Sequence, residues 1–241
     1  MNNKPCTVTN SINPIASYEA AINERPDNVV PNSSTRPKRS VASHTKYWKP
    51  GRTLKIAIYD GDQETIELVK KAASKWLPHI NLKFDFVSGE EGDIRIYINY
   101  SGDGGGTSAL GTDALTAPAD RSTMTLHIDP TNARFGYVVL HEFGHALGFA
   151  HEHQHPDADI PWDRPKTYAL YQQKFGWNRE VVDSNVLPLS RVPGHTYGSY
   201  DRHSVMHYEV TNEYTIGDWK QDENWTLSAK DIEAAQNAYP R

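Results

Sequence analysis

Imidazoles and a carboxylate crowd into the stretch HEFGHALGFAHEH, which begins at His141. His141 and His145 are four positions apart, so in a helix both side chains project from one face and can bind one metal ion. Glu142 lies about 100° around that helix, where its carboxylate can reach a metal-bound water. Gly148 tolerates the backbone that ends a helix, so the returning chain can bring His151 in as a third ligand.

The chemistry that this arrangement predicts is hydrolysis at a catalytic zinc ion. Three neutral nitrogens and an open fourth position are typical of catalytic zinc. The metal would acidify its water and polarise a carbonyl group, while Glu142 takes the proton. The alternative is a buried helix with hydrogen-bonded core histidines. The five-point pattern H-E-x-x-H-x-x-G-x-x-H disfavours it, because that pattern arises by chance in about one chain in ten thousand.

Strands and helices must position these residues. Leu54, Ile56 and Ile58 alternate with other residues, as in a strand, and three later segments do the same. The predicted strands cover residues 53–59, 81–87, 93–99 and 122–128. The predicted helices cover residues 60–80, 133–147 and 228–239. This order predicts an α+β fold with a mixed sheet.

Two of the predicted helices begin with residues that can cap them. One long segment, in contrast, has little hydrophobic periodicity. Asp60 or Asp62 can cap the first helix, and Ser228 with Asp231 resembles a capping box before the last. Residues 155–205 show weak periodicity, so we expect them to be mostly irregular.

Composition excludes several classes of protein. The chain has 241 residues and a net charge of -5, which disfavours nucleic-acid and anionic-membrane partners. No apolar run approaches the roughly 18 residues that span a bilayer. The first 20 residues lack the basic start and apolar centre of a signal peptide. A single cysteine cannot form an intrachain disulfide.

The histidine pattern resembles that of the metzincin zinc endopeptidases, which also carry a turn containing methionine beneath the metal. Here S-V-M-H-Y supplies Met206, and Tyr208 follows two residues later. This stretch, and Glu152 directly after the third histidine, resemble the astacin family specifically. The similarity begins near Trp48 and extends through the last helix, so it covers roughly residues 45–240.

This resemblance implies a fold and a set of roles. The fold would have an N-terminal subdomain (40–148) with a twisted mixed sheet and two long helices. An active-site cleft would separate it from a largely irregular C-terminal subdomain (149–241) with a closing helix. Glu142 would be the general base and acid, and Met206 a hydrophobic support under the zinc. Tyr208 would ligate the resting metal and then stabilise the oxyanion, and Glu152 would contact the mature N-terminus.

The resemblance also implies an upper-rim edge strand in NYSGDGGGTSALGTDA, which could pair with an extended peptide. The alternative for this stretch is a glycine-rich surface loop, and a calcium site through Asp103 stays open. Unlike animal members, the chain has no cysteines to pair, which indicates a bacterial type. His155, Ala158 and Arg202 also depart from the family pattern. His153 and His155 lie outside the zinc motif, and we expect both to be solvated.

Residues 1–45 read as an arm with little periodicity, rich in Asn, Ser, Pro and Thr. Lys38 and Arg39 form a basic pair, and a cut by a trypsin-like protease after Arg39 would leave Ser40 as the new N-terminus. We therefore predict an inhibitory pro-segment over residues 1–39. The F-x-G-D stretch of family zymogens is absent. The lone Cys6 could instead ligate the zinc as a cysteine switch, or it could be a free thiol in a flexible arm.

Taken together, we expect a secreted, monomeric zinc endopeptidase with one catalytic ion, captured as a latent zymogen. Its partners would be protein or peptide substrates and an activating protease, with no nucleic acid and no membrane. One alternative is a zinc-binding interaction module. The other is a related peptidase with a narrow processing role and no cysteine switch.

Overall fold

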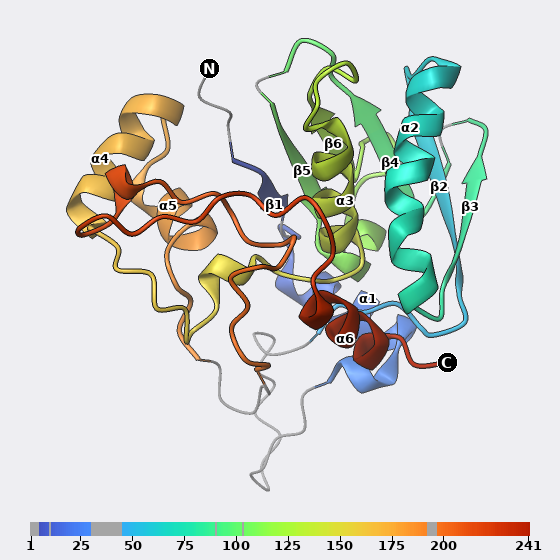
Figure 1. Cartoon of the computed structure of the whole chain (residues 1–241). Helices are drawn as coiled ribbons and strands as arrows, with labels where there is room; N and C mark the ends of the chain where they lie inside the picture. Colours follow the sequence, from blue (N-terminus) through green and yellow to red (C-terminus); the bar gives the residue numbers. More distant parts are fainter. Residues whose placement is uncertain (1–4, 10, 30–44, 90, 103, 192–196) are drawn as a thin grey trace, which may run out of the picture.

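The fold is built on one six-stranded sheet, shown in Figure 1. The computed structural model describes residues 5–9, 11–29, 45–89, 91–102, 104–191 and 197–241. The strand order is β1-β5-β6-β4-β2-β3. The strands are β1 (Thr7–Thr9), β2 (Thr53–Tyr59), β3 (Lys83–Val87), β4 (Ile94–Ile98), β5 (Gly105–Ala109) and β6 (Met124–His127). All four predicted strands are confirmed, and the α+β class with them.

The mixed character of the sheet comes from β5. It pairs antiparallel with β6, whereas β2, β3, β4 and β6 are mutually parallel. The expected edge strand is therefore present, but its outer side is already occupied. β1 pairs parallel with it, with Thr7 opposite Thr107 and Thr9 opposite Ala109. The arm thus supplies the sheet's last strand.

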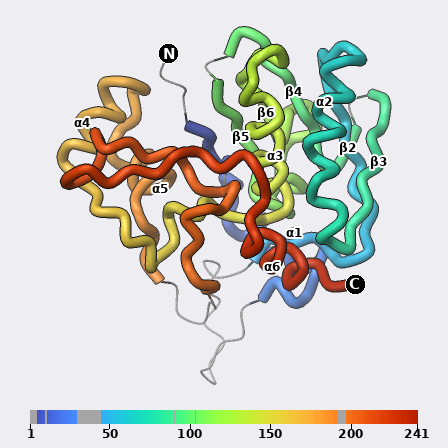
Figure 2. Tube along the Cα trace, in the orientation of Figure 1, coloured from blue at the N-terminus to red at the C-terminus, as the bar shows by residue number. Residues whose placement is uncertain are grey.

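Two helices, α2 (Gln63–Ala73) and α3 (Phe135–Ala146), lie side by side against the sheet (Figures 1 and 2). Asp62 caps α2 by accepting a hydrogen bond from the Thr65 backbone N–H at 2.7 Å. After α2 the chain tightens into a 3-10 helix (Ser74–His79). Its buried Trp76 donates from Nε1 to the Leu140 carbonyl at 3.0 Å, which ties the two helices together.

The C-terminal end of α3 is fixed by two buried aromatic side chains from distant parts of the chain. Trp48 donates from Nε1 to the Ala146 carbonyl at 2.8 Å. The Tyr239 hydroxyl donates to the Leu147 carbonyl at 2.6 Å. Both donors satisfy carbonyls that have no partner within the helix. They hold the turn that follows α3 in place.

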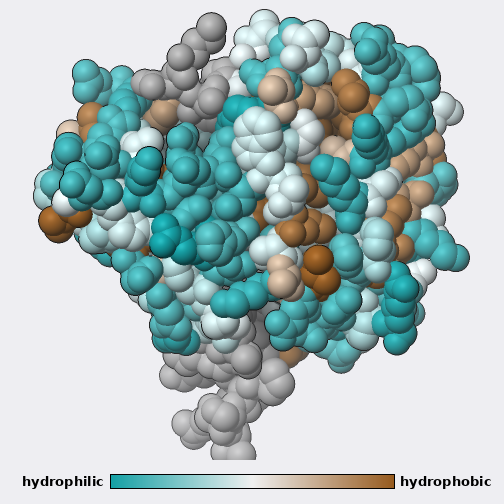
Figure 3. All heavy atoms as spheres, in the orientation of Figure 1, coloured by the Kyte–Doolittle hydropathy of each residue, from teal (hydrophilic) through white to brown (hydrophobic). Residues whose placement is uncertain are grey.

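The later half of the chain is more regular than its weak periodicity indicated. It contains α4 (Arg164–Phe175) and α5 (Arg179–Asn185), which the sequence did not predict, while most of the other described residues in 155–205 are irregular, as expected. These helices pack on a separate cluster that includes Tyr171, Val182 and Tyr214. The closing helix α6 (Ala229–Ala238) begins with the predicted capping box of Ser228 and Asp231. Hydrophilic residues cover most of the surface over α4 and α5 (Figure 3).

The arm also has regular structure, which the sequence analysis missed. Besides β1 it forms α1 (Pro14–Glu24) and a 3-10 turn (Pro26–Asn28). Asn28 is fully buried and joins the arm to the chain beyond residues 30–44. Its carbonyl and side-chain oxygens accept from the Thr45 N–H and hydroxyl at 2.9 and 2.8 Å. Its amide donates to the carbonyls of Tyr47 and Ala21 at 2.9 and 2.8 Å.

Asp113, which follows β5, forms a second anchor for the arm. It is buried and accepts from the Ser17 hydroxyl at 2.5 Å and from the Ser11 N–H at 3.3 Å. Lys46 forms an ion pair with the same carboxylate. Within the described ranges, no helix is both long and apolar enough to cross a bilayer.

Candidate active site

Three histidines converge at the end of α3. His141 and His145 lie on the helix, and Gly148, with φ of +93°, turns the chain so that His151 joins them. The nitrogen atoms that they can offer a metal lie within 4.8 Å of one another, and all three residues are buried. His145 Nε2 and His151 Nε2 are 3.0 Å apart. The structure thus brings together the three predicted ligand residues.

Backbone carbonyls orient two of these rings. His141 Nδ1 lies 2.8 Å from the Val205 carbonyl, and His145 Nδ1 lies 2.8 Å from the Phe149 carbonyl. A carbonyl only accepts, so each Nδ1 carries the proton and each Nε2 keeps its lone pair. The Nε2 atom of His141 is buried and has no hydrogen-bond partner among the described residues. An orphaned acceptor of this kind fits a metal ligand.

The rings are also neutral, as metal ligands must be. Burial lowers the pKa of His141 to about 4. Burial, reinforced by neighbouring histidines, holds the pKa of His145 and His151 well below the usual value. Three neutral nitrogens with room for another ligand form the donor set of catalytic zinc, so the residues fit that ion.

Glu142 lies beside the three histidines without a conventional hydrogen bond from the described residues. Burial raises its pKa to about 8, and the nearby Cys6 thiol, a weak donor, partly offsets that rise. β5 passes directly over this carboxylate. A Cβ atom on Gly106 would lie 2.5 Å from Glu142 Oε1, so only glycine leaves room there.

Met206 lies against the same helix from the opposite side. A Cβ on Gly144 would lie 2.3 Å from the Met206 sulfur, so the two segments are in close contact. α6 holds this turn through Asp231. Its carboxylate accepts from the Ser204 hydroxyl at 2.6 Å and from the Val205 N–H at 2.8 Å. Met206 is therefore held against α3 at Gly144, the residue that precedes His145.

Tyr208 reaches the histidine cluster from the chain that follows Met206. Its ring centroid lies 4.4 Å from that of His151, and the side chain is buried. His153 stacks on the same ring at 4.0 Å and 23°. It accepts from the Tyr208 N–H at 3.4 Å and donates to the Asn185 carbonyl at 3.0 Å. The expectation that His153 is solvated was wrong, and His155 is only half-exposed.

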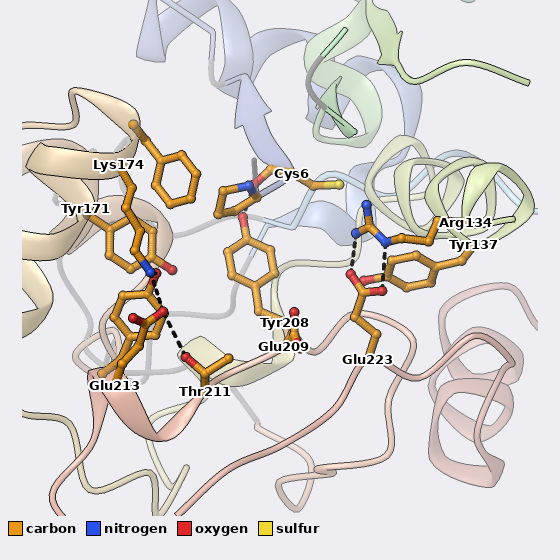
Figure 4. A pocket seen from close by; sticks show the side chains of 13 residues that line it. Cys6, Arg134, Tyr137, Tyr171, Lys174, Tyr208, Glu209, Thr211, Glu213 and Glu223 are labelled. Carbon is orange, nitrogen blue, oxygen red and sulfur yellow. Dashed lines mark hydrogen bonds and ion pairs between the residues drawn. The ribbon is translucent and has the colours of Figure 1, made fainter. Parts of the chain in front are cut away.

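Cys6 lies at this site next to Tyr208 (Figure 4). It is 5% exposed, and its sulfur lies within 4.8 Å of potential ligand atoms of His141 and Glu142. Burial, and next the Glu142 carboxylate, raise the pKa of the thiol well above its ordinary value. The Cys6 carbonyl accepts a hydrogen bond from the Tyr208 hydroxyl. Cys6 is thus held among the candidate catalytic groups.

Glu152 lies behind the site, on a cavity of about 620 Å³ that Thr45 also lines. Its carboxylate accepts from the Asp201 N–H at 2.7 Å. Burial raises the pKa of Glu152 to about 7. The predicted cleavage residues Arg39 and Ser40, and the calcium candidate Asp103, lie outside the described residues.

Comparisons with known proteins agree with this geometry. A structure of myroilysin aligns with a TM-score of 0.75 and 34% identity, over 81% of this chain and 96% of that one. A second myroilysin structure aligns with 99% of this chain and 92% of its own, at a TM-score of 0.66 and 30% identity. Zinc metalloproteinase nas-26 of Caenorhabditis elegans is 28% identical over 187 residues, which are 75% of this chain and 43% of that protein.

The chain therefore spans less than half the length of that curated relative. The model of the Astacin peptidase family matches residues 40–238, from the end of the arm to the closing helix. This match includes all three converging histidines, Glu142, Met206 and Tyr208. The chain belongs to the astacin family of peptidases.

Proposed function

We propose that this chain is a zinc-dependent endopeptidase held latent by its own N-terminal residues. The convergence of three neutral, buried imidazoles beside a carboxylate without a conventional hydrogen bond carries the proposal. Bound to His141, His145 and His151, zinc would supply a Lewis acid that polarises the peptide carbonyl and acidifies a water. Family membership supports the same activity.

The residues of the chain then handle the protons. Glu142, whose carboxylate lies close to His141, would take a proton from water and return it to the departing amine. The Tyr208 hydroxyl would donate a hydrogen bond to the oxyanion. Met206 would support the ligand helix from below. Removing such an oxyanion donor typically costs about 100-fold or more in turnover.

Latency would come from Cys6 acting as a fourth zinc ligand. Its burial next to His141 and Glu142 supports this role, because the thiol lies where the reacting water would bind. β1 fixes the thiol there by pairing with β5 on the edge of the sheet. A thiolate on zinc would exclude that water until the arm leaves.

Activation would follow a cut between Arg39 and Ser40 by a trypsin-like protease, which separates the pro-segment (1–39) from the peptidase domain (40–241). That domain would comprise subdomains 40–148 and 149–241 on either side of the cleft. Glu152 would receive the new N-terminal amine in its cavity, which Thr45 already lines. Ser40 precedes Thr45 by five positions, a reach of at most about 18 Å. We propose a monomeric, secreted enzyme acting on proteins or peptides.

A glutamate variant tests the catalytic proposal. Glu142→Gln in the trypsin-cut protein should keep stoichiometric zinc and lose casein cleavage by at least about 1000-fold, because no base remains. Glu67→Gln, on the exposed side of α2, is the matched control and should cleave as the parent does. Normal turnover by Glu142→Gln would refute the mechanism.

X-ray absorption at the zinc edge of the uncut protein tests the latch. A sulfur neighbour at about 2.3 Å beside three nitrogens would support ligation by Cys6. A shell of nitrogen and oxygen alone would overturn that part of the proposal and leave the peptidase activity standing.

A further inference from the structure

A pocket of about 260 Å³ opens beside the candidate catalytic groups. Pro5, Cys6 and Tyr208 form part of its wall, so it begins where the arm meets Tyr208 (Figure 4). The arm now fills the position directly in front of the histidines. Once the arm leaves, a substrate residue next to the cleaved bond would face this pocket.

The first cation of the pocket is fully engaged. Arg134 donates from Nε to Glu223 at 2.9 Å, and its Nη2 forms an ion pair with the same carboxylate. Its Nη1 donates to the Gly104 carbonyl at 2.7 Å. All three nitrogens of the guanidinium therefore already have partners within the protein, and the Arg134 side chain is only 14% exposed.

The second cationic side chain of the pocket, that of Lys174, also has partners within the protein. Lys174 forms an ion pair with Glu213 and lies 3.4 Å from the Tyr214 hydroxyl. These are the only Lys and Arg side chains among the described residues that line the pocket. An acidic substrate side chain would therefore have to break an existing ion pair to find a partner.

One carboxylate in the pocket forms no ion pair with any residue that the structure describes. Glu209 lies between the two ion pairs, directly after Tyr208 (Figure 4). Glu213 and Glu223 are matched by Lys174 and Arg134, so Glu209 leaves the pocket with one unmatched negative charge. Glu209 is exposed, and the other two carboxylates of the pocket, those of Glu213 and Glu223, line the same space.

Aromatic rings complete the wall on the α4 side. Tyr171, Phe175 and Tyr214 all line the pocket, and the rings of Tyr171 and Tyr214 are 5.0 Å apart. Such faces suit the methylene stem of a long side chain. The Lys174 ammonium already lies 5.1 Å from the Tyr214 ring centroid, so the wall offers the stem apolar packing and leaves the charged tip to Glu209. The aromatic wall and the Glu209 carboxylate thus both favour a ligand with a long apolar stem and a positively charged tip.

We propose that this pocket binds a Lys or Arg side chain of the substrate beside the cleaved bond, with Glu209 as the specificity-determining residue. The inference rests on the proposed peptidase activity and adds a substrate class to it. Glu209 accepts the cationic tip, while the aromatic wall packs against its stem. A charge-assisted hydrogen bond of this type corresponds to about a tenfold preference over a neutral side chain.

Fluorogenic peptides that differ at a single position test this preference. Lys, norleucine and Glu are placed in turn at each of the two residues flanking the cleaved bond. The cut protein is assayed with residual trypsin inhibited, and only cleavage that a zinc chelator abolishes is counted. We expect kcat/KM for Lys to exceed that for norleucine about tenfold at one position, with Glu poorer than both.

Two variants with the same change in charge locate the effect. Glu209→Gln should bring the Lys-to-norleucine ratio close to one. Asp222→Asn removes an exposed charge outside the pocket lining and should keep most of the ratio. A parent ratio at or below one, or a ratio that survives Glu209→Gln, would overturn the proposal. Absence of chelator-sensitive cleavage of every peptide would instead refute the peptidase activity.

Discussion

The Tyr208 hydroxyl donates a hydrogen bond to the backbone carbonyl of Cys6, which lies 202 residues earlier in the chain. Cys6 therefore engages the candidate site twice, through its thiol beside Glu142 and through its carbonyl at Tyr208. The group that we assign to the oxyanion is bound by the arm in this state. Loss of the thiol alone would leave the second contact in place.

Replacing the tyrosine tests its catalytic role. Tyr208→Phe keeps the ring that stacks on His153 but removes the donor, so kcat/KM of the cut protein should fall about 100-fold with zinc content unchanged. Tyr97→Phe, on an exposed position of β4, serves as the control. Equal activity of Tyr208→Phe and the parent protein would remove the hydroxyl from the mechanism.

Replacing the cysteine tests latency. Uncut Cys6→Ala should digest casein or itself, because water can reach the zinc once the thiol is gone. Cys6→Ser is a conservative companion, since a hydroxyl binds zinc much more weakly than a thiolate does. Full latency of uncut Cys6→Ala would show that the thiol is not the essential block, and that the remaining arm contacts suffice.

Replacing Asp113 tests how the arm is held on the rest of the protein. Asp113→Asn removes the charge that Lys46 and Ser17 share, so the free energy of unfolding of the uncut protein should fall by about 3 kcal/mol. Limited proteolysis should then reach residues 11–29 sooner. Asp85→Asn, at an exposed position of β3, should change neither measurement. An unchanged digestion pattern in Asp113→Asn would mean that α1 is held elsewhere.

Replacing Gly106 tests whether the close contact between β5 and the Glu142 carboxylate matters for turnover. In Gly106→Ala the new methyl group would lie 2.5 Å from Glu142 Oε1, so the carboxylate must move. We expect turnover to drop at least about tenfold, since small displacements of catalytic groups are costly. Gly136→Ala, whose Cβ meets no atom within 4 Å, should keep full turnover. Full activity of Gly106→Ala would show that Glu142 tolerates displacement.

The sequence predicted those elements whose pattern depends only on residues close together in the chain. The spacing of His141, His145 and Gly148 depends only on helix geometry, and α3 and its terminal turn follow it. The capping box of Ser228 and Asp231 is equally local. The alternating strands were visible because one side chain in two is buried in the core.

The missed elements depend on contacts with distant residues. β1 has only three residues and exists as a strand because β5 offers an unpaired edge. α4 has little amphipathic pattern, since it packs on a second, smaller hydrophobic cluster rather than on the main core. His153 is buried because the chain near Asn185 and Tyr208 folds over it, and no neighbouring residue in the sequence indicates that contact.

Asn28 links the arm to the chain beyond the predicted cleavage site by hydrogen bonds. A cut after Arg39 would not by itself break the hydrogen bonds between Asn28 and the Thr45–Tyr47 segment, because these bonds join the two sides of the cut without the peptide link. The severed arm would then have to dissociate, so we expect activation to need two successive steps, cleavage and dissociation of the arm. Thr45 also lines the cavity of Glu152, so the departing arm and the arriving N-terminus compete for the same short segment.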